Sequence, residues 1–257
     1  MIKKYYGNLV KAFFREKLQF TPGDVNLIFH SISNASNHSN IYEISSERFV
    51  EICDYLNKLS VEYELLFGKK IKLCLTFDDG LKNFITTAFP IIKKYNFSVK
   101  IFVIVEKLLS RDPNYLNIKD LTLLSKERNI EIGVHGYYHR DLSKMDINEL
   151  NNEFDQISET LAKFQQHFDS FSLPYGRASD LTIERLKHYK YKSIYLSDYG
   201  TMKKCKDGFC LNQRIDIWCS DSNRDIKDKI FNRWRFYFYL ESFKSGIYRL
   251  KNIVHSL

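Results

Sequence analysis

Short runs of apolar residues alternate along this chain with longer segments in which apolar residues recur at helical spacing. The short runs predict strands at 25–30, 70–77, 98–105, 130–135, 171–174, 191–197 and 212–218. The longer segments predict helices at 46–67, 83–95, 118–128, 146–168 and 179–189. Because parallel strands need crossover connections, this alternation predicts a parallel α/β sheet or barrel.

The segments before and after this alternation are basic and amphipathic. Residues 2–17 have apolar side chains at helical spacing among lysines and arginines, which predicts a helix that packs on the domain or lies on a membrane surface. Residues 226–251 include FNRWRFYFYL and predict an interfacial helix beside anionic lipid, a cap on the fold or a dimer contact. We therefore divide the chain into an N-terminal amphipathic helix (1–24), a central domain (25–220) and an aromatic, basic helical extension (221–257).

Length and charge narrow the class of protein. A chain of 257 residues with 44% hydrophobic and 27% charged residues is typical of a globular α/β domain. Its net charge of +8 attracts anions, but the chain has no long basic run and no nucleic-acid-binding motif, so we expect no nucleic acid partner. The sequence shows no secretory h-region and no apolar stretch of about 18 residues. We expect a cytoplasmic location. Peripheral contact of the chain with the inner face of the membrane is compatible with it.

Two of the five cysteines are close in sequence. Cys205 and Cys210 lie in the turn-like stretch KKCKDGFC and could pair with each other. Reduced thiols are the simpler expectation for a cytoplasmic protein.

Polar residues stand at the ends of four predicted strands. They are His30, the pair Asp78 and Asp79, His135, and the dipeptide Pro174–Tyr175. In parallel α/β folds and barrels the carboxyl ends of the strands lie on one face, where sites form. We therefore expect these distant residues to converge.

The pair Asp78 and Asp79 and the pair His135 and His139 are candidates for a metal site. Adjacent carboxylates at a strand end point in different directions, so one can bind a cation while its neighbour faces a substrate. Two histidines four residues apart can converge on one helix face or from a tight loop. Two imidazoles and one carboxylate make a three-ligand site that leaves a position open for water.

Three motifs then resemble a known family. TFDDG (76–80), EIGVHGYYHRDLS (131–143) and SLPYG (172–176) are similar, in order and spacing, to the first three motifs of the polysaccharide deacetylases with a NodB-homology domain, carbohydrate esterase family four. The stretch VNLIFHSI and the following SSERFVEICDYLNKL also resemble the start of the exopolysaccharide deacetylase subgroup. The resemblance covers residues 25–218. It implies a distorted (β/α) barrel of about seven strands in a single domain, here with N- and C-terminal helical extensions.

The resemblance also implies roles for the site residues. Asp79, His135 and His139 would bind a divalent metal, zinc above all, although the same ligands accept cobalt or nickel. Asp78 would be the general base, and the backbone N–H of Tyr175 would stabilise the oxyanion. The reaction implied is release of acetate from an acetylated sugar.

The sequence departs from the family pattern at two positions. The general acid usually comes from a histidine near the C-terminus, where His255 is the nearest match, but in the exopolysaccharide subgroup it comes from the first strand, where His30 stands. We favour His30, which could instead be a hydrogen-bonded structural histidine. Ser172 occupies the place of an arginine that contacts the base. Arg214 could restore this charge from a neighbouring strand, or it could pair with Asp216 for structure.

Substrate contacts are predicted around the third motif and the last strand. Pro174 and Tyr175 are expected to contact the sugar. Trp218 could line the acetyl pocket, but a buried core tryptophan is the favoured interpretation.

We therefore expect a metal-dependent enzyme that hydrolyses a carbon–nitrogen bond, removing the N-acetyl group from a sugar of a surface glycan or of its lipid-linked precursor. An O-deacetylase of an acetylated glycan is the first alternative. A non-catalytic glycan-binding protein with a vestigial site is the second.

Overall fold

The structure is a closed barrel of parallel strands, whose order around the barrel is their order in the chain. The computed structural model describes residues 24–34, 40–200 and 203–231 of the chain. Its barrel strands, in spatial order, are β1 (Val25–Phe29), β4 (Leu73–Phe77), β5 (Ser98–Val103), β6 (Ile130–Val134), β7 (Ser170–Ser172), β8 (Ser193–Tyr199) and β10 (Phe209–Asp216). All of these pairings are parallel, and β10 also pairs with β1, which closes the sheet. The predicted (β/α) barrel is confirmed.

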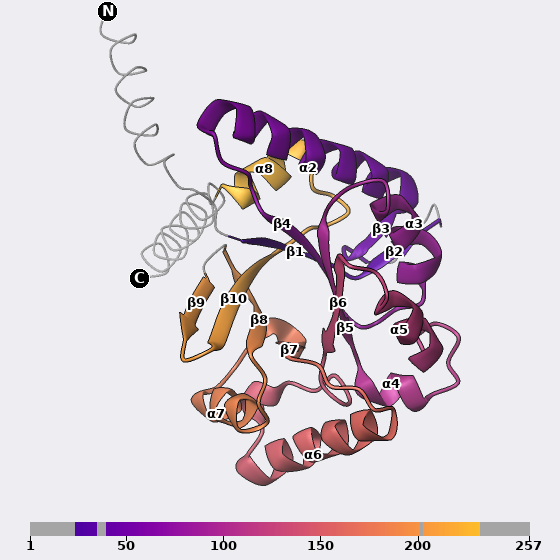
Figure 1. Cartoon of the computed structure of the whole chain (residues 1–257), viewed down its shortest axis with the longest axis vertical. Coiled ribbons are helices and arrows are strands. Elements are labelled where there is room, and N and C mark those ends of the chain that lie inside the picture. The colour runs from indigo at the N-terminus through magenta and orange to yellow at the C-terminus, as the bar shows by residue number, and fades with distance from the viewer. Residues whose placement is uncertain (1–23, 35–39, 201–202, 232–257) are drawn as a thin grey trace, which may run out of the picture. The chain divides into compact units, whose positions relative to one another are not determined.

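Helices surround this barrel on the outside (Figure 1). They are α2 (Ser46–Phe67), α3 (Phe89–Ile92), α4 (Val105–Leu109), α5 (Ile118–Leu124), α6 (Ile147–Lys163) and α7 (Asp180–His188). The compact unit that contains the barrel runs from Gly23 to Asp221. A second unit contains α8 (Asn223–Ile230). Most of the two predicted terminal extensions, 1–24 and 221–257, lies outside the described residues, and the domain boundaries stay a prediction.

The first crossover helix shows how local sequence produces the fold. Helix α2 begins after Ser45, whose side chain accepts a hydrogen bond from the backbone N–H of Arg48 (3.1 Å) and so caps the first turn. It ends at Gly68, which has the left-handed conformation (φ 66°) that favours glycine. The helix buries Phe49, whose ring contacts the ring of Phe29 edge-on at a centroid distance of 5.3 Å. This contact holds α2 against β1.

Some elements were not predicted. The polar segment after β1 includes β2 (Ser31–Ser33), which pairs with β3 (Glu43–Ser45) in a small parallel sheet. The expected helix at 83–95 is a π-helical turn at Phe84–Ala88 followed by α3. None of the helices in the described part of the chain is long and apolar enough to cross a membrane.

The expectation of reduced thiols was wrong for one pair of cysteines. Strand β9 (Lys203–Lys206) forms an antiparallel hairpin with β10, and the register places Cys205 directly opposite Cys210. The two form a disulfide with a Cα–Cα distance of 4.1 Å. The physical reason is the hairpin, because the sequence separation of five residues brings them together only when the turn at Asp207–Gly208 is in place. Cys53, Cys74 and Cys219 are free thiols.

Candidate metal centre

The predicted site residues gather at the carboxyl end of the barrel strands. The backbone N–H of Asp78, just after β4, donates to the carbonyl of Phe29 at the end of β1 (3.0 Å). The backbone N–H of His135, just after β6, donates to the carbonyl of Val103 at the end of β5 (2.8 Å). These bonds continue the parallel ladder by one residue. Both side chains are therefore held by the sheet itself and are buried.

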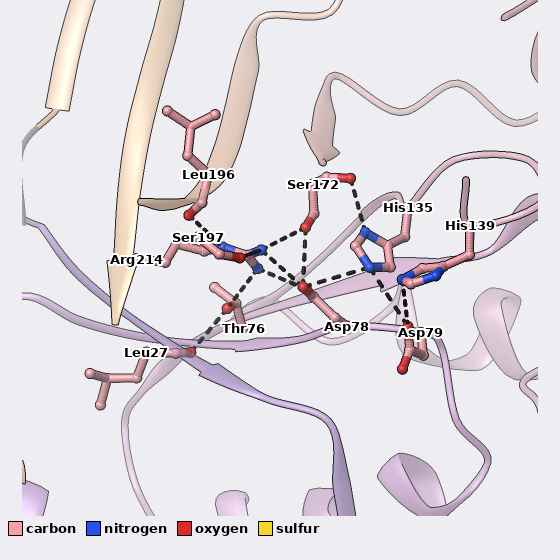
Figure 2. Close-up of polar contacts among 10 residues, drawn as sticks. All are labelled: Leu27, Thr76, Asp78, Asp79, His135, His139, Ser172, Leu196, Ser197 and Arg214. Carbon is pink, nitrogen blue, oxygen red and sulfur yellow. Dashed lines mark hydrogen bonds and ion pairs between the residues drawn. The ribbon is translucent and has the colours of Figure 1, made fainter. Parts of the chain in front are cut away.

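Asp79, His135 and His139 form a group of ligand atoms that fits one metal ion. The Oδ1 atom of Asp79 lies 3.6 Å from Nε2 of His135 and 3.5 Å from Nε2 of His139 (Figure 2). All the ligand atoms lie within 4.8 Å of one another. Ligands of a tetrahedral zinc ion with bonds near 2.0–2.1 Å are about 3.3 Å apart, so the residues present fit such an ion.

The local backbone explains how these ligands converge. Asp79 and His139 have positive φ angles of 69° and 59°, so each ligand sits on a sharp turn rather than on a helix. The histidine pair therefore converges from a tight loop, one of the two expected arrangements. Gly80 (φ 67°) permits the exit after Asp79, because a Cβ atom there would lie 2.9 Å from Cγ1 of Val103.

His135 is oriented by its second ring nitrogen. Its Nδ1 lies 2.9 Å from the carbonyl oxygen of Ser172, and a carbonyl can only accept, so Nδ1 carries the proton. Nε2 is left with its lone pair toward Asp79. Burial lowers the pKa of His135, although Asp78 and Asp79 act in the opposite direction. A neutral imidazole of this tautomer is the form that binds a metal.

The Asp78 carboxylate lies between His135 and Arg214 (Figure 2). Nη1 of Arg214 donates to Oδ1 of Asp78 (2.7 Å), and Nη2 donates to Oδ2 (2.9 Å). Oδ2 also accepts from the hydroxyl of Ser172 (3.2 Å) and is 3.7 Å from Nε2 of His135. Burial alone would raise the pKa of Asp78, but Arg214, His135 and His30 outweigh it, and the pKa lies well below its usual range.

The remaining donors of Arg214 are also used. Nε donates to the carbonyl of Leu196 (3.2 Å), Nη1 to the hydroxyl of Thr76 (3.2 Å), and Nη2 to the hydroxyl of Ser172 (2.8 Å). Every N–H of the guanidinium thus has an acceptor, and Arg214 pairs with Asp78 rather than with Asp216. Strand β10 is not the neighbour of β4, however, because β1 lies between them.

His30 and the third-motif residue Tyr175 lie near the candidate metal ligands. The register that pairs Phe29 with Phe77 places His30 beside Asp78, and the His30 ring packs on Tyr42 at 4.7 Å. Tyr175 has a positive φ of 60°, is 62% exposed, and its ring lies 5.1 Å from that of His139. These residues are close to the ligands.

The remaining predicted site residues are Pro174, Trp218 and His255. Pro174 is buried in the turn that carries Tyr175. Trp218 is half-buried just beyond β10, where its backbone N–H donates to the Asp221 carboxylate (2.8 Å). His255 lies outside the described residues.

A cavity of about 340 Å³ opens beside the metal ligands and was not predicted. Its lining consists of Asp79, Ile104, Glu106, Lys107, Tyr115, Tyr138 and His139. Ile104, Glu106 and Lys107 directly follow β5, which ends without a recognisable motif. The strand-end argument that found Asp78 and His135 would have found these residues too, had it been applied to β5.

Comparisons with known proteins agree with this geometry. The family model described as polysaccharide deacetylase matches residues 68–194. The peptidoglycan-N-acetylmuramic acid deacetylase PdaA of Bacillus subtilis is 26% identical over 148 residues, which are 55% of this chain and 54% of PdaA. The chain thus spans about half the length of that relative.

Solved structures share the fold. The Streptococcus pyogenes deacetylase PplD has a TM-score of 0.67 at 21% identity, covering 82% of this chain and 99% of PplD. IcaB from Ammonifex degensii has a TM-score of 0.63 at 18% identity, covering 82% of this chain and 97% of IcaB. The matched motifs, the closed parallel barrel and the family model agree: this chain is a member of the polysaccharide deacetylase family with a NodB-homology domain.

Proposed function

We propose that this chain is a metal-dependent deacetylase that removes the N-acetyl group from a sugar of a surface glycan or of its lipid-linked precursor and releases acetate. The family indicates a hydrolase that acts on an acetylated sugar. The observation that carries the finer proposal is the buried Asp78 carboxylate, kept ionised by Arg214 and placed 3.7 Å from the metal-facing nitrogen of His135.

The metal would be held by Asp79, His135 and His139, and zinc, cobalt or nickel suits this donor set. When bound, it supplies a Lewis acid that polarises the acetyl carbonyl and lowers the pKa of water to about 7. Asp78 accepts the proton of the attacking water at Oδ2, the oxygen that faces His135. Arg214 is a positioning residue, since it holds both carboxylate oxygens and keeps Asp78 ionised at neutral pH.

Amide cleavage also requires a proton donor for the leaving nitrogen. The position of His30 supports this role, because it directly follows the first strand of the barrel, beside Asp78. An ester needs less help from an acid, so the position of His30 favours N-deacetylation over O-deacetylation. The backbone N–H of Tyr175 would bind the oxyanion from the sharp turn after β7.

The sugar would lie across the exposed aromatic rim of the site. Tyr138 and Tyr175 are 52% and 62% exposed. Tyr138 lines the same cavity as His139, and the Tyr175 ring lies 5.1 Å from the His139 ring. The apolar ring of a tyrosine can pack on the apolar face of a pyranose, and its hydroxyl can bond to the hydroxyls of the sugar. Pro174 and Trp218 would complete the pocket around the acetyl group.

Peripheral membrane contact is a separate part of the proposal. It rests on the basic amphipathic sequences of segments 1–24 and 221–257, both largely outside the described residues. Such segments bind anionic lipids, which give the cytoplasmic leaflet its negative potential. Sedimentation with anionic and with neutral liposomes tests it, and equal recovery in the supernatant of both would reject it.

Acetate release by metal-reconstituted protein tests the activity. Matched N-acetylated and O-acetylated oligosaccharides, free and lipid-linked, should show release from the N-acetylated members. Asp78→Asn should keep the metal and lose most turnover, whereas His135→Ala should lose both. Release from the O-acetylated members alone would establish the O-deacetylase alternative. No release from any, with metal bound, would favour the non-catalytic one.

A further inference from the structure

The loop between the two histidine ligands is attached to α6 by one buried carboxylate. Glu153 lies in the middle of α6, and its side chain is fully buried. Apart from Thr160, the other residues on the buried face of the helix are apolar: Leu150, Phe154, Ile157 and Leu161. A charged side chain in such a stripe is unusual and requires partners.

Both partners of Glu153 belong to the loop. Oε1 accepts a hydrogen bond from the backbone N–H of Tyr137 (2.6 Å), and Oε2 accepts one from Nη2 of Arg140 (2.7 Å). Tyr137 is two residues after His135, and Arg140 directly follows His139. Glu153 thus holds the loop at both ends of the segment that carries the second ligand.

The opposite side of the loop is held by the backbone. The carbonyl of Gly136 accepts from the N–H of Val105 (3.1 Å), and the carbonyl of Tyr137 accepts from the N–H of Glu106 (3.1 Å). Gly136 also has a left-handed backbone (φ 76°), and a Cβ atom there would lie 3.2 Å from Cγ of Pro174. The loop is therefore fixed between the start of α4 and Glu153.

We propose that Glu153 is a positioning residue of the metal centre, which holds His139 within reach of the ion that Asp79 and His135 also bind. His139 has a left-handed backbone (φ 59°), a conformation that a histidine keeps only where its surroundings impose it. Stability alone does not account for the carboxylate, because Glu153 is completely buried while Arg140 is 41% exposed, and well-packed apolar side chains would avoid the cost of burying a charge there. The inference rests on the metal dependence proposed above.

The test measures metal affinity of the full-length, metal-free protein by zinc titration against a chromophoric chelator. The variants are Glu153→Ala, which removes both loop contacts, and Glu153→Gln, which keeps an acceptor for Tyr137 but not the charge that pairs with Arg140. Glu159→Gln, an exposed glutamate on the same helix, is the matched control. Loss of a contact that orients a metal ligand typically costs about 10–100-fold in metal affinity, so we expect a loss of about tenfold or more for Glu153→Ala.

The other variants and the readouts separate positioning from folding. Glu153→Gln should lose less affinity than Glu153→Ala, and Glu159→Gln should bind zinc as the unmodified protein does. Circular dichroism and the thermal midpoint of the metal-free variants report the fold. A purely structural role would lower that midpoint without changing affinity at temperatures where each variant is folded. Saturating zinc should restore acetate release by Glu153→Gln.

The outcomes for the two proposals differ. Folded Glu153 variants that bind zinc as tightly as the unmodified protein would overturn the positioning role while leaving the metal site intact. If Glu153→Ala does not fold, the affinity of Glu153→Gln decides. An unmodified protein that binds no zinc, cobalt or nickel would overturn the proposed metal dependence, and the role of Glu153 with it.

Discussion

Arg214 and Asp78 form a buried, two-bond ion pair across the interior of the barrel. The contacts are 2.7 and 2.9 Å, and both side chains are almost completely shielded from solvent. A buried carboxylate stays ionised only when an opposite charge and hydrogen bonds compensate for the lost water. The short Ser172 side chain leaves room for the guanidinium and bonds to it (2.8 Å). The positive charge that the family pattern has at the position of Ser172, on β7, is thus supplied by Arg214 on β10.

The first prediction concerns the acidity of Asp78. Arg214→Gln removes the main group that lowers the pKa of Asp78, so that pKa should rise and the acid limb of the kcat/KM–pH profile should move to higher pH. Activity should fall by about 100-fold or more at neutral pH. Arg214→Lys keeps the charge but not the two paired hydrogen bonds. Its activity and its acid limb should lie between those of the unmodified protein and those of Arg214→Gln.

Arg128→Gln, an exposed arginine, is the control and should leave the profile unchanged. Arg214→Gln also leaves a buried carboxylate without its partner, which should cost about 3–5 kcal/mol of unfolding free energy in urea. An unmoved acid limb in a folded Arg214→Gln would show that Arg214 does not set the protonation of the base.

The second prediction concerns His30. If His30 protonates the leaving group, His30→Gln should slow cleavage of an N-acetyl sugar far more than cleavage of an activated acetate ester, whose leaving group needs little protonation. The measurement is kcat/KM for both substrates with the same metal-loaded protein. His167→Gln, at an exposed position, should change neither rate. Equal losses on the two substrates would assign His30 a structural role.

The strand ends were predictable because each depends on a short stretch of sequence. An apolar run followed by Asp78–Asp79, or by His135, identifies a strand and the residue at its end without knowledge of the rest of the chain. Parallel strands then bring such ends to one face whatever their sequence separation. The three candidate ligands and the candidate base, Asp78, were therefore placed together from the sequence.

Contacts that depend on barrel closure were not predictable in the same way. Whether Arg214 contacts Asp78 or Asp216 depends on which side chains point into the barrel at that level. That Arg214 lies two strands from β4 follows only from the pairing of β10 with β1. The Cys205–Cys210 disulfide depends on the register of one hairpin. Glu153 did leave a signal, since it is a charged residue within the apolar stripe of α6.

The third prediction concerns stability and pH in the metal-free protein. Burial lowers the pKa of His135 below its ordinary 6.5, so between that lowered pKa and about pH 6.5 the unfolded chain binds a proton at His135 that the folded protein does not. The free energy of unfolding should therefore decrease as pH falls below that value and should not change through His135 above it. Urea unfolding at several pH values, with a chelator present, measures this. His135→Gln should flatten the dependence, and equal slopes for the two proteins would contradict the burial argument.

The last prediction compares two glycines that share a backbone conformation but not a packing environment. Gly176 and Gly208 both have positive φ angles, 68° and 78°, so an alanine at either pays the left-handed penalty of about 1–2 kcal/mol. A Cβ at Gly208 would meet nothing within 4 Å, whereas one at Gly176 would lie 2.2 Å from Cβ of Ser197.

Gly176→Ala should therefore cost about 1–3 kcal/mol more than Gly208→Ala in urea unfolding, because β8 and the turn after β7 must separate. The same separation displaces the backbone N–H of Tyr175, so acetate release should fall in Gly176→Ala and remain unchanged in Gly208→Ala. Equal unfolding free energies for the two variants would mean that β8 yields easily at Ser197. In that case close packing against β8 would not be what holds the turn of Tyr175 in place.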